Sequence, residues 1–582
     1  MILGISISHN ASVAVTSMDG IVVEALEEER VTRIKGYWGI PVKSIDLMSQ
    51  KYSIDEIVIG SHLKLSLKEM EIFESQLVGN PSNPIGRYSK PFPGFSSSFS
   101  QGNPNENLGN LVLSIVRKHH PNRNIPISWV EHHDSHIGSA LGLFQEDSII
   151  FSFDGNGDGL SSKIYISKKL SNPELTKINE THRNNSLGSL YSAVTSLYNF
   201  KPNSHEGKIT GLAAFGSMSQ ANDYLNSKIK VKDGSISLKI PQNSFSRLIF
   251  KIFNYLMRKL VLPITIVDIA LIASSKTKNY ADLAFAIQKT LEDSMAKVVN
   301  FHVLKNGITN ISLTGGVFAN VKLNSVLAGL DSVEKCRVFP NMGDGGISLG
   351  CIWFLLAKRK ELSVGRLYKD MFLGPINSHT KDEIDLLVHE GDIEVSEIDG
   401  NSITLNIVED LTAGLIVGIH RGRMEFGPRA LGHRSIIANP NLDNVNAEIN
   451  KRLKRTEFMP LAPIICAEAF DVYFEPQKDM QPFEYMTMTA NVKSEYLKRL
   501  GGVVHIDGTA RPQIVTIESD EYIYRILKSF GDKNGVYALI NTSFNVHEQP
   551  INYELNDSVS VLKSGGVDVI YTEKFKLKLK KH

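Results

Sequence analysis

Three short apolar stretches, each running into a loop rich in glycine or aspartate, constrain how this chain of 582 residues can fold. The stretches are residues 149–153, 311–314 and 337–339, and their loops are residues 154–159, 315–316 and 343–346. Apolar runs of this length, bounded by turn residues, are typical of buried strands, and two of the loops lead into helical patterns. Because ligands bind at the carboxyl ends of strands in open α/β sheets, the pattern predicts an α/β fold with ligand loops at those ends.

The N-terminus has the pattern of a strand hairpin. Residues 2–7 are mostly apolar, and a loop follows at His9-Asn10. Ala14 and Val15 resume the apolar pattern, and Asp19-Gly20 is a turn signal before the next strand at residues 22–25. Actin-like ATPase domains begin with such a hairpin, whose first turn faces a phosphate. No internal repeat is visible in the sequence.

The composition is that of an ordinary globular protein, with 42% hydrophobic and 21% charged residues. The 63 basic and 62 acidic residues leave a net charge of +1, which gives no global field for capturing nucleic acid or an anionic membrane. The three cysteines form no CxxC pair. This argues against a disulfide framework or a cysteine zinc site, and it suits a reducing cytoplasm.

No stretch reaches the roughly 18 apolar residues of a membrane-spanning helix. The most apolar one, residues 248–270, is interrupted by four charged residues and a proline, so we expect amphipathic helices there. No basic flank precedes the first apolar residues, and we therefore expect no signal peptide. These features predict a cytoplasmic protein with no membrane partner.

The segment HHDSH, residues 132–136, carries the sharpest chemical signal. His132 and His136 are four residues apart, so on a helix they share one face and can bind one metal ion. Asp154 and Asp344 stand in two of the glycine loops. Two imidazoles and two carboxylates without a thiolate favour iron, manganese or cobalt over structural zinc.

The glycine loops predict a nucleotide site. In the loop that holds Gly155, Asn156 and Gly157, a backbone without Cβ atoms allows close approach of a nucleotide. Gly315 and Gly316 precede a helix expected to begin near Phe318, whose N-terminal amides would face an anion or a ribose. Further along the chain, Lys208 is a candidate phosphate ligand, and Gly211 follows it in the same motif.

The second half concentrates cations, hydroxyls and amides. Residues 422–435 contain three arginines, and a basic cluster follows at residues 451–455. Arginine binds phosphate and carboxylate in a bidentate way, so this half suits a phosphorylated small molecule beside ATP. A nucleic-acid surface is the alternative, but glycine, proline and acids interrupt the basic residues. The lysines of the C-terminal segment 574–582 alternate with apolar residues, as in an edge strand or tail.

Together these motifs resemble the NodU/CmcH/TobZ family of O-carbamoyltransferases. The resemblance spans almost the whole chain and keeps the order of ten segments. In the first half these are residues 9–36, 132–136, 154–159, 186–216, 315–320 and 343–346. In the second half they are residues 422–435, 454–463, 505–513 and 541–545.

The resemblance implies two domains and a reaction. Residues 1–360 would form a metal-containing actin-like ATPase-fold domain similar to the tRNA threonylcarbamoyl transferases, residues 361–375 a linker, and residues 376–582 a YrdC-like α/β domain. The second domain would convert carbamoyl phosphate and ATP to carbamoyl-adenylate. The first domain, with Fe(II) or another divalent metal such as Mn or Co, would transfer the carbamoyl group to an acceptor hydroxyl. Mg is a further candidate cofactor.

The resemblance also implies site residues. The family's metal ligands fall on the four residues that the spacing selects, and its adenylate loops fall on Gly155 to Asp158, Lys208, Gly315, Gly316 and Asn320. Its carbamoyl phosphate and ATP contacts fall on Arg429, Lys454, Arg455, Arg511, Ser543 and Asn545. One departure is Met459, where many members have arginine before the proline, so Lys454 is less secure than Arg511. A base must take the acceptor's proton, and His9, His133 and Asp158 are the candidates.

Several alternatives remain at the level of sequence. The acceptor is predicted to be a small molecule or glycan hydroxyl, with the hydroxymethyl group of a modified DNA or RNA base as second choice. A tRNA threonylcarbamoyl-type enzyme and a non-enzymatic actin-like nucleotide switch are the other readings. The acceptor pocket is expected to draw on residues 79–110 and 248–270. The sequence leaves the oligomeric state and the identity of the metal open.

Overall fold

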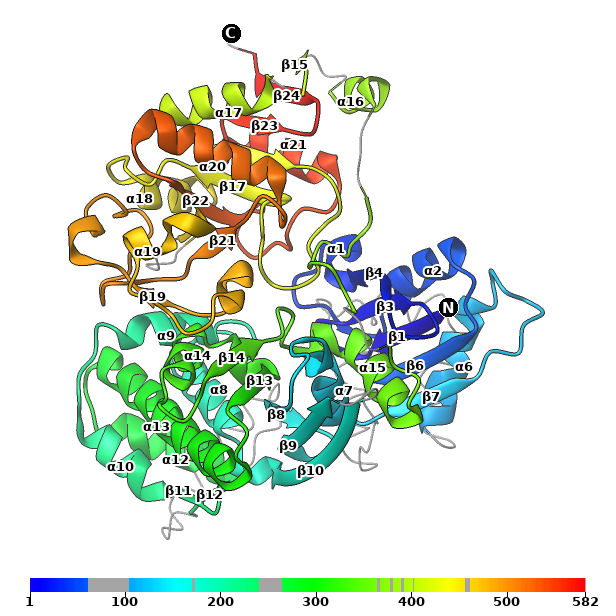
Figure 1. Cartoon of the computed structure of the whole chain (residues 1–582), viewed down its shortest axis with the longest axis vertical. Coiled ribbons are helices and arrows are strands. Elements are labelled where there is room, and N and C mark those ends of the chain that lie inside the picture. The colour runs from blue at the N-terminus through cyan, green and yellow to red at the C-terminus, as the bar shows by residue number, and fades with distance from the viewer. Residues whose placement is uncertain are drawn as a thin grey trace. The chain divides into compact units, whose positions relative to one another are not determined.

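The computed structural model describes residues 1–60, 104–169, 173–239, 264–363, 367–376, 380–388, 392–400, 402–455 and 461–580. It divides into two compact units (Figure 1). The first comprises residues 1–32 and 36–368, and the second residues 33–35 and 369–582. The boundary at Tyr368 falls within the segment 361–375 that the sequence analysis assigned to a linker. Most of the two segments expected to form the acceptor pocket lies outside the described residues.

The first unit contains two five-stranded sheets with the same topology. In the first sheet the strand order is β4-β3-β1-β6-β7, where β1, β3 and β4 are antiparallel neighbours and β6 and β7 run parallel to β1. These strands are β1 (Ile2–Ser6), β3 (Ser12–Thr16), β4 (Val22–Glu27), β6 (Glu56–Gly60) and β7 (Ile127–Val130). The N-terminal hairpin predicted from the sequence is thus formed by β3 and β4, with β1 beside β3.

The second sheet repeats this pattern in the order β10-β9-β8-β13-β14, with β8 in the place of β1. Its strands are β8 (Ser148–Gly157), β9 (Leu160–Lys169), β10 (Pro173–His182), β13 (Asn310–Thr314) and β14 (Lys335–Val338). Two mixed sheets of this order in one unit are the topology of the actin-like ATPase fold. The α/β fold class predicted from the sequence is therefore confirmed, and the duplication exists in the fold although the sequence shows no repeat.

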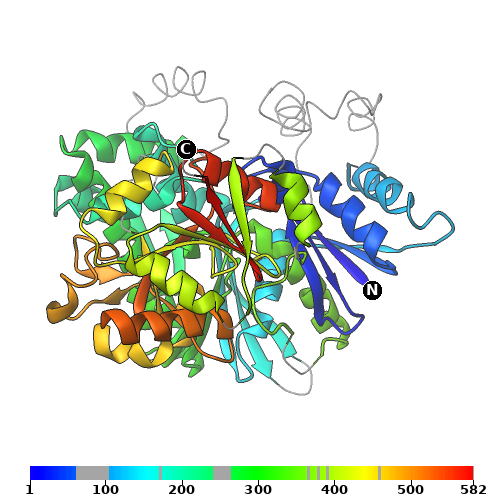
Figure 2. The same ribbon diagram turned by 90° about the horizontal axis from the view of Figure 1, so that it is seen from above.

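Helices cover these sheets. Figure 2 shows α2 (Val42–Lys51) and α6 (Pro104–Val116) side by side beside the first sheet, and the two helices are in contact. The others of this unit are α1 (Glu28–Thr32), α7 (His132–Ser139), α8 (Leu187–Leu197), α9 (Glu206–Ala213), α10 (Gln220–Lys228), α12 (Ile264–Ser275), α13 (Tyr280–Asn306), α14 (Val321–Ala328) and α15 (Ile347–Arg359). Short ladders are formed by β2 (Ser8–His9) with β5 (Trp38–Gly39) and by β11 (Ile229–Lys232) with β12 (Ser235–Leu238).

A pair of glycines lets α7 and α15 approach closely. A Cβ atom on Gly138 of α7 would lie 1.9 Å from the carbonyl oxygen of Gly350 on α15. A Cβ atom on Gly350 would in turn lie 1.9 Å from the carbonyl oxygen of Ser135. Only glycine fits at both positions, because any larger residue would push the helices apart. The close contact fixes α7, which carries the HHDSH segment, against the core of the unit.

The second unit is built on an eight-stranded mixed sheet, in the order β15-β24-β23-β16-β17-β22-β18-β21. The strands are β15 (Ile393–Glu397), β16 (Val417–His420), β17 (Arg434–Ala438), β18 (Ala462–Cys466), β21 (Gln513–Val515), β22 (Ala538–Ser543), β23 (Val569–Tyr571) and β24 (Phe575–Leu579), with a separate ladder of β19 (Ala490–Asn491) and β20 (Thr509–Ala510). Its helices are α16 (Lys381–Leu387), α17 (Ile403–Thr412), α18 (Val445–Arg452), α19 (Phe470–Tyr473), α20 (Glu521–Asn534) and α21 (Leu555–Lys563).

The lysine-rich C-terminal segment is not an edge strand. β24 lies between β15 and β23 and pairs with both. Lys576 forms an ion pair with Asp410 at 2.7 Å, and Lys578 forms one with Glu394 at 3.3 Å. The alternation of lysine and apolar residues therefore reflects a paired strand with one buried face. None of the described helices has the length and apolar character needed to cross a membrane.

Candidate active site

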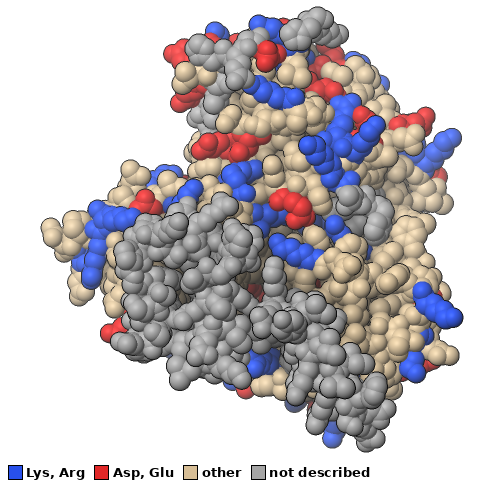
Figure 3. Space-filling model, turned by 180° about the vertical axis from the view of Figure 1, so that it is seen from behind, with Lys and Arg blue, Asp and Glu red and all other residues tan. Residues whose placement is uncertain are grey.

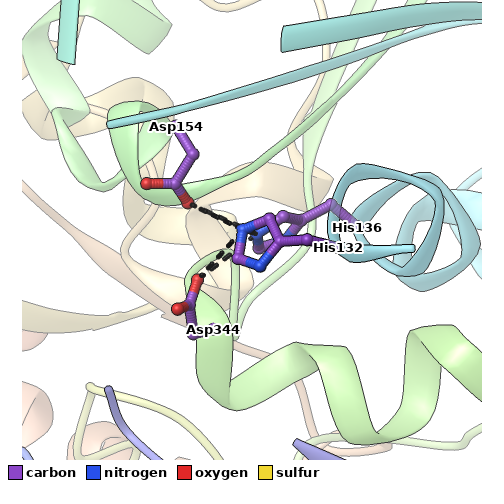
Figure 4. A group of neighbouring side chains, drawn as sticks. All are labelled: His132, His136, Asp154 and Asp344. Atoms are coloured by element: carbon purple, nitrogen blue, oxygen red, sulfur yellow. Dashed lines mark hydrogen bonds and ion pairs between the residues drawn. The ribbon is translucent and has the colours of Figure 1, made fainter. Parts of the chain in front are cut away.

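Four side chains of the first unit converge on one point (Figure 4). They are His132 and His136 from α7, Asp154 from β8 and Asp344 from the glycine loop after β14, and one donor atom of each lies within 4.8 Å of the others. Both histidines are buried, and both carboxylates are largely buried. The structure thus brings together all four residues that the sequence predicts as metal ligands.

The spacing of the donor atoms fits a single ion. The Nε2 atoms of the two histidines are 3.2 Å apart. His136 Nε2 lies 3.3 Å from Asp154 Oδ2 and 3.4 Å from Asp344 Oδ1, and the corresponding distances from His132 Nε2 are 3.9 and 3.6 Å. A tetrahedron with edges of about 3.4 Å has its centre about 2.1 Å from each corner, which is a normal metal–ligand distance. The donor set and its spacing therefore fit a divalent cation.

The chain holds these donors through the loops that follow the strands. The backbone amide of Gly316 donates to Asp154 Oδ2 at 3.0 Å, and Asp158 Oδ2 accepts from the backbone amide of His132 at 2.9 Å. Gly157 leaves room for the imidazole of His132, since a Cβ atom there would lie 2.0 Å from the ring. The glycines expected to approach a nucleotide therefore also make space for the metal ligands.

Without an ion, the imidazoles and carboxylates of this cluster stabilise one another's charges. Burial alone would lower the pKa of His132, but Asp344 and Asp154 outweigh it and raise this pKa to about 9. Burial likewise opposes ionisation of Asp154, yet His132 and His136 hold its pKa well below the usual range. The pocket favours a bound positive charge, whether proton or metal.

His9 stands at the edge of the cluster. Its Nδ1 lies 3.4 Å from Asp344 Oδ2, and its Nε2 lies 3.2 Å from the carbonyl oxygen of Asn203. Its side chain is 31% exposed, in contrast to the buried His132 and His136. Burial tends to lower the pKa of His9, but Asp344 raises it to about 9. His9 is thus a partly exposed histidine in contact with one of the four donors.

The two other candidate bases contact the elements that carry the metal ligands. His133 is buried, its Nδ1 lies 2.8 Å from Ser152 Oγ, and burial together with its charged neighbours holds its pKa well below the usual value. Asp158 binds the first amide of α7 and has a left-handed backbone with φ of 52°. Both are therefore engaged with α7 and β8, the elements that carry the donors.

The predicted nucleotide residues lie in the same unit. Gly155 and Gly157 end β8, with Asn156 between them, and the carbonyl oxygen of Gly155 accepts from Ser189 Oγ at 2.8 Å. Gly315 has φ of 97°, and Gly316 faces the Asp154 carboxylate. Lys208 and Gly211 are buried on α9, and Lys208 Nζ lies 5.3 Å from the centre of the Phe200 ring.

Asn320 has a local structural task that the sequence analysis did not foresee. It caps α14, where its Oδ1 accepts from the backbone amide of Leu323 at 3.0 Å. Its Nδ2 donates to Gln288 Oε1 at 2.7 Å. The helix expected near Phe318 therefore begins at Val321, after a 3₁₀ turn over Gly316–Ala319. A nucleotide contact by Asn320 stays a prediction.

In the second unit, the partly buried side chain of Arg429 has no partner among the described residues. Its guanidinium makes no hydrogen bond or ion pair with the residues that the structure describes, and its Nε is fully buried. Burial lowers the pKa of Arg429 to about 10. Arg421, which directly precedes this glycine-rich segment, is instead neutralised in an ion pair with Asp520. An anionic ligand would supply the missing partner of Arg429.

Lys454 and Arg455, the two basic residues whose register the sequence left open, follow α18 and differ in their surroundings. Arg455 donates from Nη1 to Thr542 Oγ1 at 2.6 Å and from Nη2 to Ser543 Oγ at 3.2 Å, at the end of β22. Lys454 is exposed and has φ of 57°. Arg455 is therefore the residue directed at the predicted ligand serine. Asn545 turns its Nδ2 to the carbonyl oxygens of Val546 and Gln549, and Arg511 follows β20 with a buried Nε.

Comparison with known proteins decides the family. The model of the carbamoyltransferase N-terminus matches residues 1–352, and that of the carbamoyltransferase C-terminus matches residues 408–578. The chain belongs to the carbamoyltransferase family. The resemblance found in the sequence is confirmed, and carbamoyl transfer is the activity of this family.

Relatives of this carbamoyltransferase extend along most of its length. An uncharacterised protein of Methanocaldococcus jannaschii is 31% identical, covering 98% of both chains. The nodulation protein NolNO of Sinorhizobium fredii is 27% identical, over 97% of this chain and 78% of its own. The nodulation protein NolO of Bradyrhizobium diazoefficiens is 26% identical, over 75% of this chain and 77% of its own.

Among solved structures, full-length HypF in its phosphate- and nucleotide-bound form has a TM-score of 0.30 at 14% identity, covering 63% of this chain and 47% of its own. Component A of the (R)-2-hydroxyglutaryl-CoA dehydratase of Acidaminococcus fermentans has a TM-score of 0.31 at 11% identity, covering 61% and 98%. Scores this low carry no argument about the function of this carbamoyltransferase.

Several residues around the site escaped the sequence analysis. Asn203 contacts His9, and Ser152 contacts His133. Lys163 and Tyr165 of β9 bind the first turn of α7. The one signal for Lys163 was a lysine inside an apolar strand pattern, and its burial is evident only from the fold.

Proposed function

We propose that this carbamoyltransferase uses ATP and carbamoyl phosphate to carbamoylate a hydroxyl group. In the first step, carbamoyl phosphate loses its phosphate with uptake of water. The resulting carbamate oxygen then displaces pyrophosphate from the α-phosphate of ATP, which forms carbamoyl-adenylate. In the second step, the acceptor oxygen bonds to the carbamoyl carbon, AMP leaves, and the acceptor's proton passes to a base.

The observation that carries this proposal is the four-donor cluster beside His9 in a member of the carbamoyltransferase family. A divalent cation held by His132, His136, Asp154 and Asp344, which we propose to be Fe(II), would polarise a carbonyl oxygen or hold a nucleotide phosphate. Of the three candidate bases we favour His9, whose side chain is 31% exposed. A cation bound to Asp344 would weaken the interaction that raises the pKa of His9 and would leave its imidazole able to accept a proton. His133 and Asp158, tied to β8 and α7, support the cluster.

The activation step is assigned to the second, YrdC-like unit. Its unpartnered Arg429 and the group of Arg455 with Ser543 suit phosphate oxygens. The basic side chains of this unit neither attack nor accept protons, so their contribution is to position the anions and neutralise their charge. Because all three cysteines of the chain are free and buried, we place the enzyme in the cytoplasm.

The acceptor that we favour is an alcohol of a sugar, glycan or natural product. A modified nucleic-acid base is disfavoured by the pairing of Lys576, Lys578 and Arg452 with carboxylates. On the described part of the face in Figure 3, basic and acidic side chains are interspersed. A continuous basic surface of the kind that binds nucleic acid is therefore absent from that part.

The test is a reaction with defined components. The purified protein is incubated with Fe(II), ATP and carbamoyl phosphate, and with pools of sugars, polyketide alcohols or DNA containing hydroxymethylated bases. We expect pyrophosphate release that requires carbamoyl phosphate, and a carbamoyl mass gain in the sugar or alcohol pool by mass spectrometry. Replacing carbamoyl phosphate with threonine and bicarbonate serves as the control for a threonylcarbamoyl-type enzyme.

The outcomes separate the parts of the proposal. A mass gain only in the DNA pool would identify nucleic acid as the acceptor, while the proposed carbamoyl transfer would still hold. Pyrophosphate release with threonine and bicarbonate, but not with carbamoyl phosphate, would indicate a threonylcarbamoyl-type reaction instead. Absence of pyrophosphate release with every substrate, in a folded and metal-supplied protein, would refute ATP-dependent activation.

A further inference from the structure

A buried lysine on β9 lies against the helix that carries both histidine ligands. Lys163 Nζ is 2.6 Å from Glu131 Oε2 and 2.8 Å from Asp134 Oδ1, and the lysine side chain is only 4% exposed. The hydroxyl of Tyr165, two residues along the same strand, donates to Asp134 Oδ1 at 2.9 Å. Two side chains of β9 therefore bind the first turn of α7.

The partner strand of the same hairpin supplies a metal ligand. Ser152 of β8 is the cross-strand neighbour of Lys163, and its Oγ lies 2.8 Å from His133 Nδ1. Asp154 follows two residues after Ser152, a spacing that places both on one face of the strand. The β8–β9 hairpin thus holds α7 and also provides one of the four donors.

Helix geometry links the clamped residues to the ligands. Glu131 and Asp134, three residues apart, lie on one face at the start of α7, whereas His132 and His136, four apart, lie on another. A helical turn moves as a rigid piece, so a shift on the first face displaces both imidazoles. Burial opposes the charge of Lys163, but Asp134 and Glu131 outweigh it and raise the pKa of this lysine above its usual value.

We propose that Lys163 is a positioning residue that sets the spacing between the histidine and aspartate donors by anchoring α7 to the β8–β9 hairpin. The inference rests on the metal site of the proposed function. Lys163 touches neither the donors nor a substrate. It neutralises the largely buried Asp134 and the partly exposed Glu131, which would otherwise repel each other and weaken the contact between the helix and the hairpin.

The proposal predicts a loss of metal affinity without loss of a ligand. Changes in residues that orient metal ligands typically weaken binding by about 10- to 100-fold, and we expect this loss for Lys163→Met. Lys163→Arg keeps the charge and should bind metal more tightly than Lys163→Met. Tyr165→Phe removes only one of the hydrogen bonds to Asp134, so we expect about a tenfold loss, the lower end of that range.

The experiment uses the full chain and Co²⁺ as the probe. Titration against a competing chelator gives the Kd, and the visible d–d absorption of Co²⁺ reports the coordination geometry. Lys163→Met should raise the Kd and alter the absorption bands, while far-UV circular dichroism of the metal-free protein stays unchanged. His136→Ala is the control for a lost ligand. Lys177→Met, which removes an exposed ion pair with Glu180 on the neighbouring β10, is the control for a lost lysine.

Two results would overturn the inference, and they are distinguishable. If the wild type binds Co²⁺ and His136→Ala does not, but Lys163→Met binds with wild-type Kd and absorption, the anchoring role is wrong and the metal site stands. If the wild type and His136→Ala have the same Kd for Co²⁺ and the same absorption, the metal site itself is wrong, and so is the anchoring role of Lys163. Should Lys163→Met fail to fold, Tyr165→Phe decides, and an unchanged Kd there refutes the anchor.

Discussion

Arg429 indicates an anionic ligand, because its guanidinium has no partner among the described residues. A partly buried guanidinium that no described residue neutralises is unfavourable in the free protein, and a bound anion would remove that cost. The sequence could name Arg429 as one cation among many. It could not separate Arg429 from Arg421, because only the fold shows that Arg421 is already paired with Asp520.

We therefore expect Arg429→Met to affect stability and activity in opposite directions. Removing the unpaired charge should raise the free energy of unfolding by about 1 kcal/mol. Loss of the anion partner should slow pyrophosphate release by about 100-fold. Urea denaturation and a pyrophosphate assay measure the two effects. Arg421→Met is the matched control, expected to lower stability by about 3 kcal/mol because the buried carboxylate of Asp520 loses its guanidinium partner. A destabilised Arg429→Met with normal pyrophosphate release would contradict the assignment.

At the scale of elements, the start of α2 depends on a residue far from it in the chain. Glu28 is buried and accepts the backbone amides of Lys43 and Ser44 at 3.0 and 2.8 Å. α2 has Pro41 at its N-cap and no cap from its own side chains. Burial of the carboxyl group outweighs these hydrogen bonds and raises the pKa of Glu28 to about 7.

This raised pKa predicts a pH dependence of stability. The unfolded chain releases the Glu28 proton near its ordinary pKa of about 4.3, before the folded protein does. The stabilisation is therefore full below that pH and is lost as the pH rises through about 7. The stability difference between the wild type and Glu28→Gln should be about 2.5 kcal/mol larger at pH 5 than at pH 8.

Glu56 provides a control of opposite sign for this measurement. Burial would raise its pKa, but the guanidinium of Arg359 at 2.8 and 2.9 Å outweighs burial and lowers it. Its contribution is present above the ordinary glutamate pKa and is lost as the pH falls through the lowered pKa of the folded state. Denaturation at several pH values compares the free energies of unfolding of Glu28→Gln and Glu56→Gln. If the difference in the free energy of unfolding between the wild type and Glu28→Gln does not decrease from pH 5 to pH 8, the account of Glu28 is wrong.

Elements were predictable where the local pattern and the fold agree. The three strands before Asp154, Gly315 and Gly343 follow from periodicity, although β8 continues through Gly157 instead of ending at Phe153. The spacing of His132 and His136 suits the helix α7 that carries them. The lysine-rich end was mistaken for an edge, because its alternation fixes which face is buried but not which strands lie on either side. The anchor at Lys163 depends on tertiary contacts that no local pattern encodes.

For the whole molecule, the two sheets of the first unit show what sequence comparison within one chain misses. Both have the same strand order, yet only the topology repeats. Such a fold requires the placement of apolar strands and tight turns, which many sequences satisfy. The cluster lies within this unit, formed by α7, β8 and the loop after β14, whereas Arg429 belongs to the second unit.

This separation predicts that the two half-reactions fail independently. His136→Ala should retain pyrophosphate release that depends on carbamoyl phosphate, because Arg429 and Arg455 are untouched, and it should lose acceptor carbamoylation. Arg429→Met should lose pyrophosphate release with ATP and carbamoyl phosphate. It should still carbamoylate the acceptor from added carbamoyl-adenylate, because the cluster beside His9 is intact. Paired assays of pyrophosphate and of acceptor mass measure both halves in each variant, with Lys177→Met as the folded control that should lose neither. If His136→Ala also stops pyrophosphate release while its fold is unchanged, the cluster takes part in activation, and the division of labour between the units is wrong.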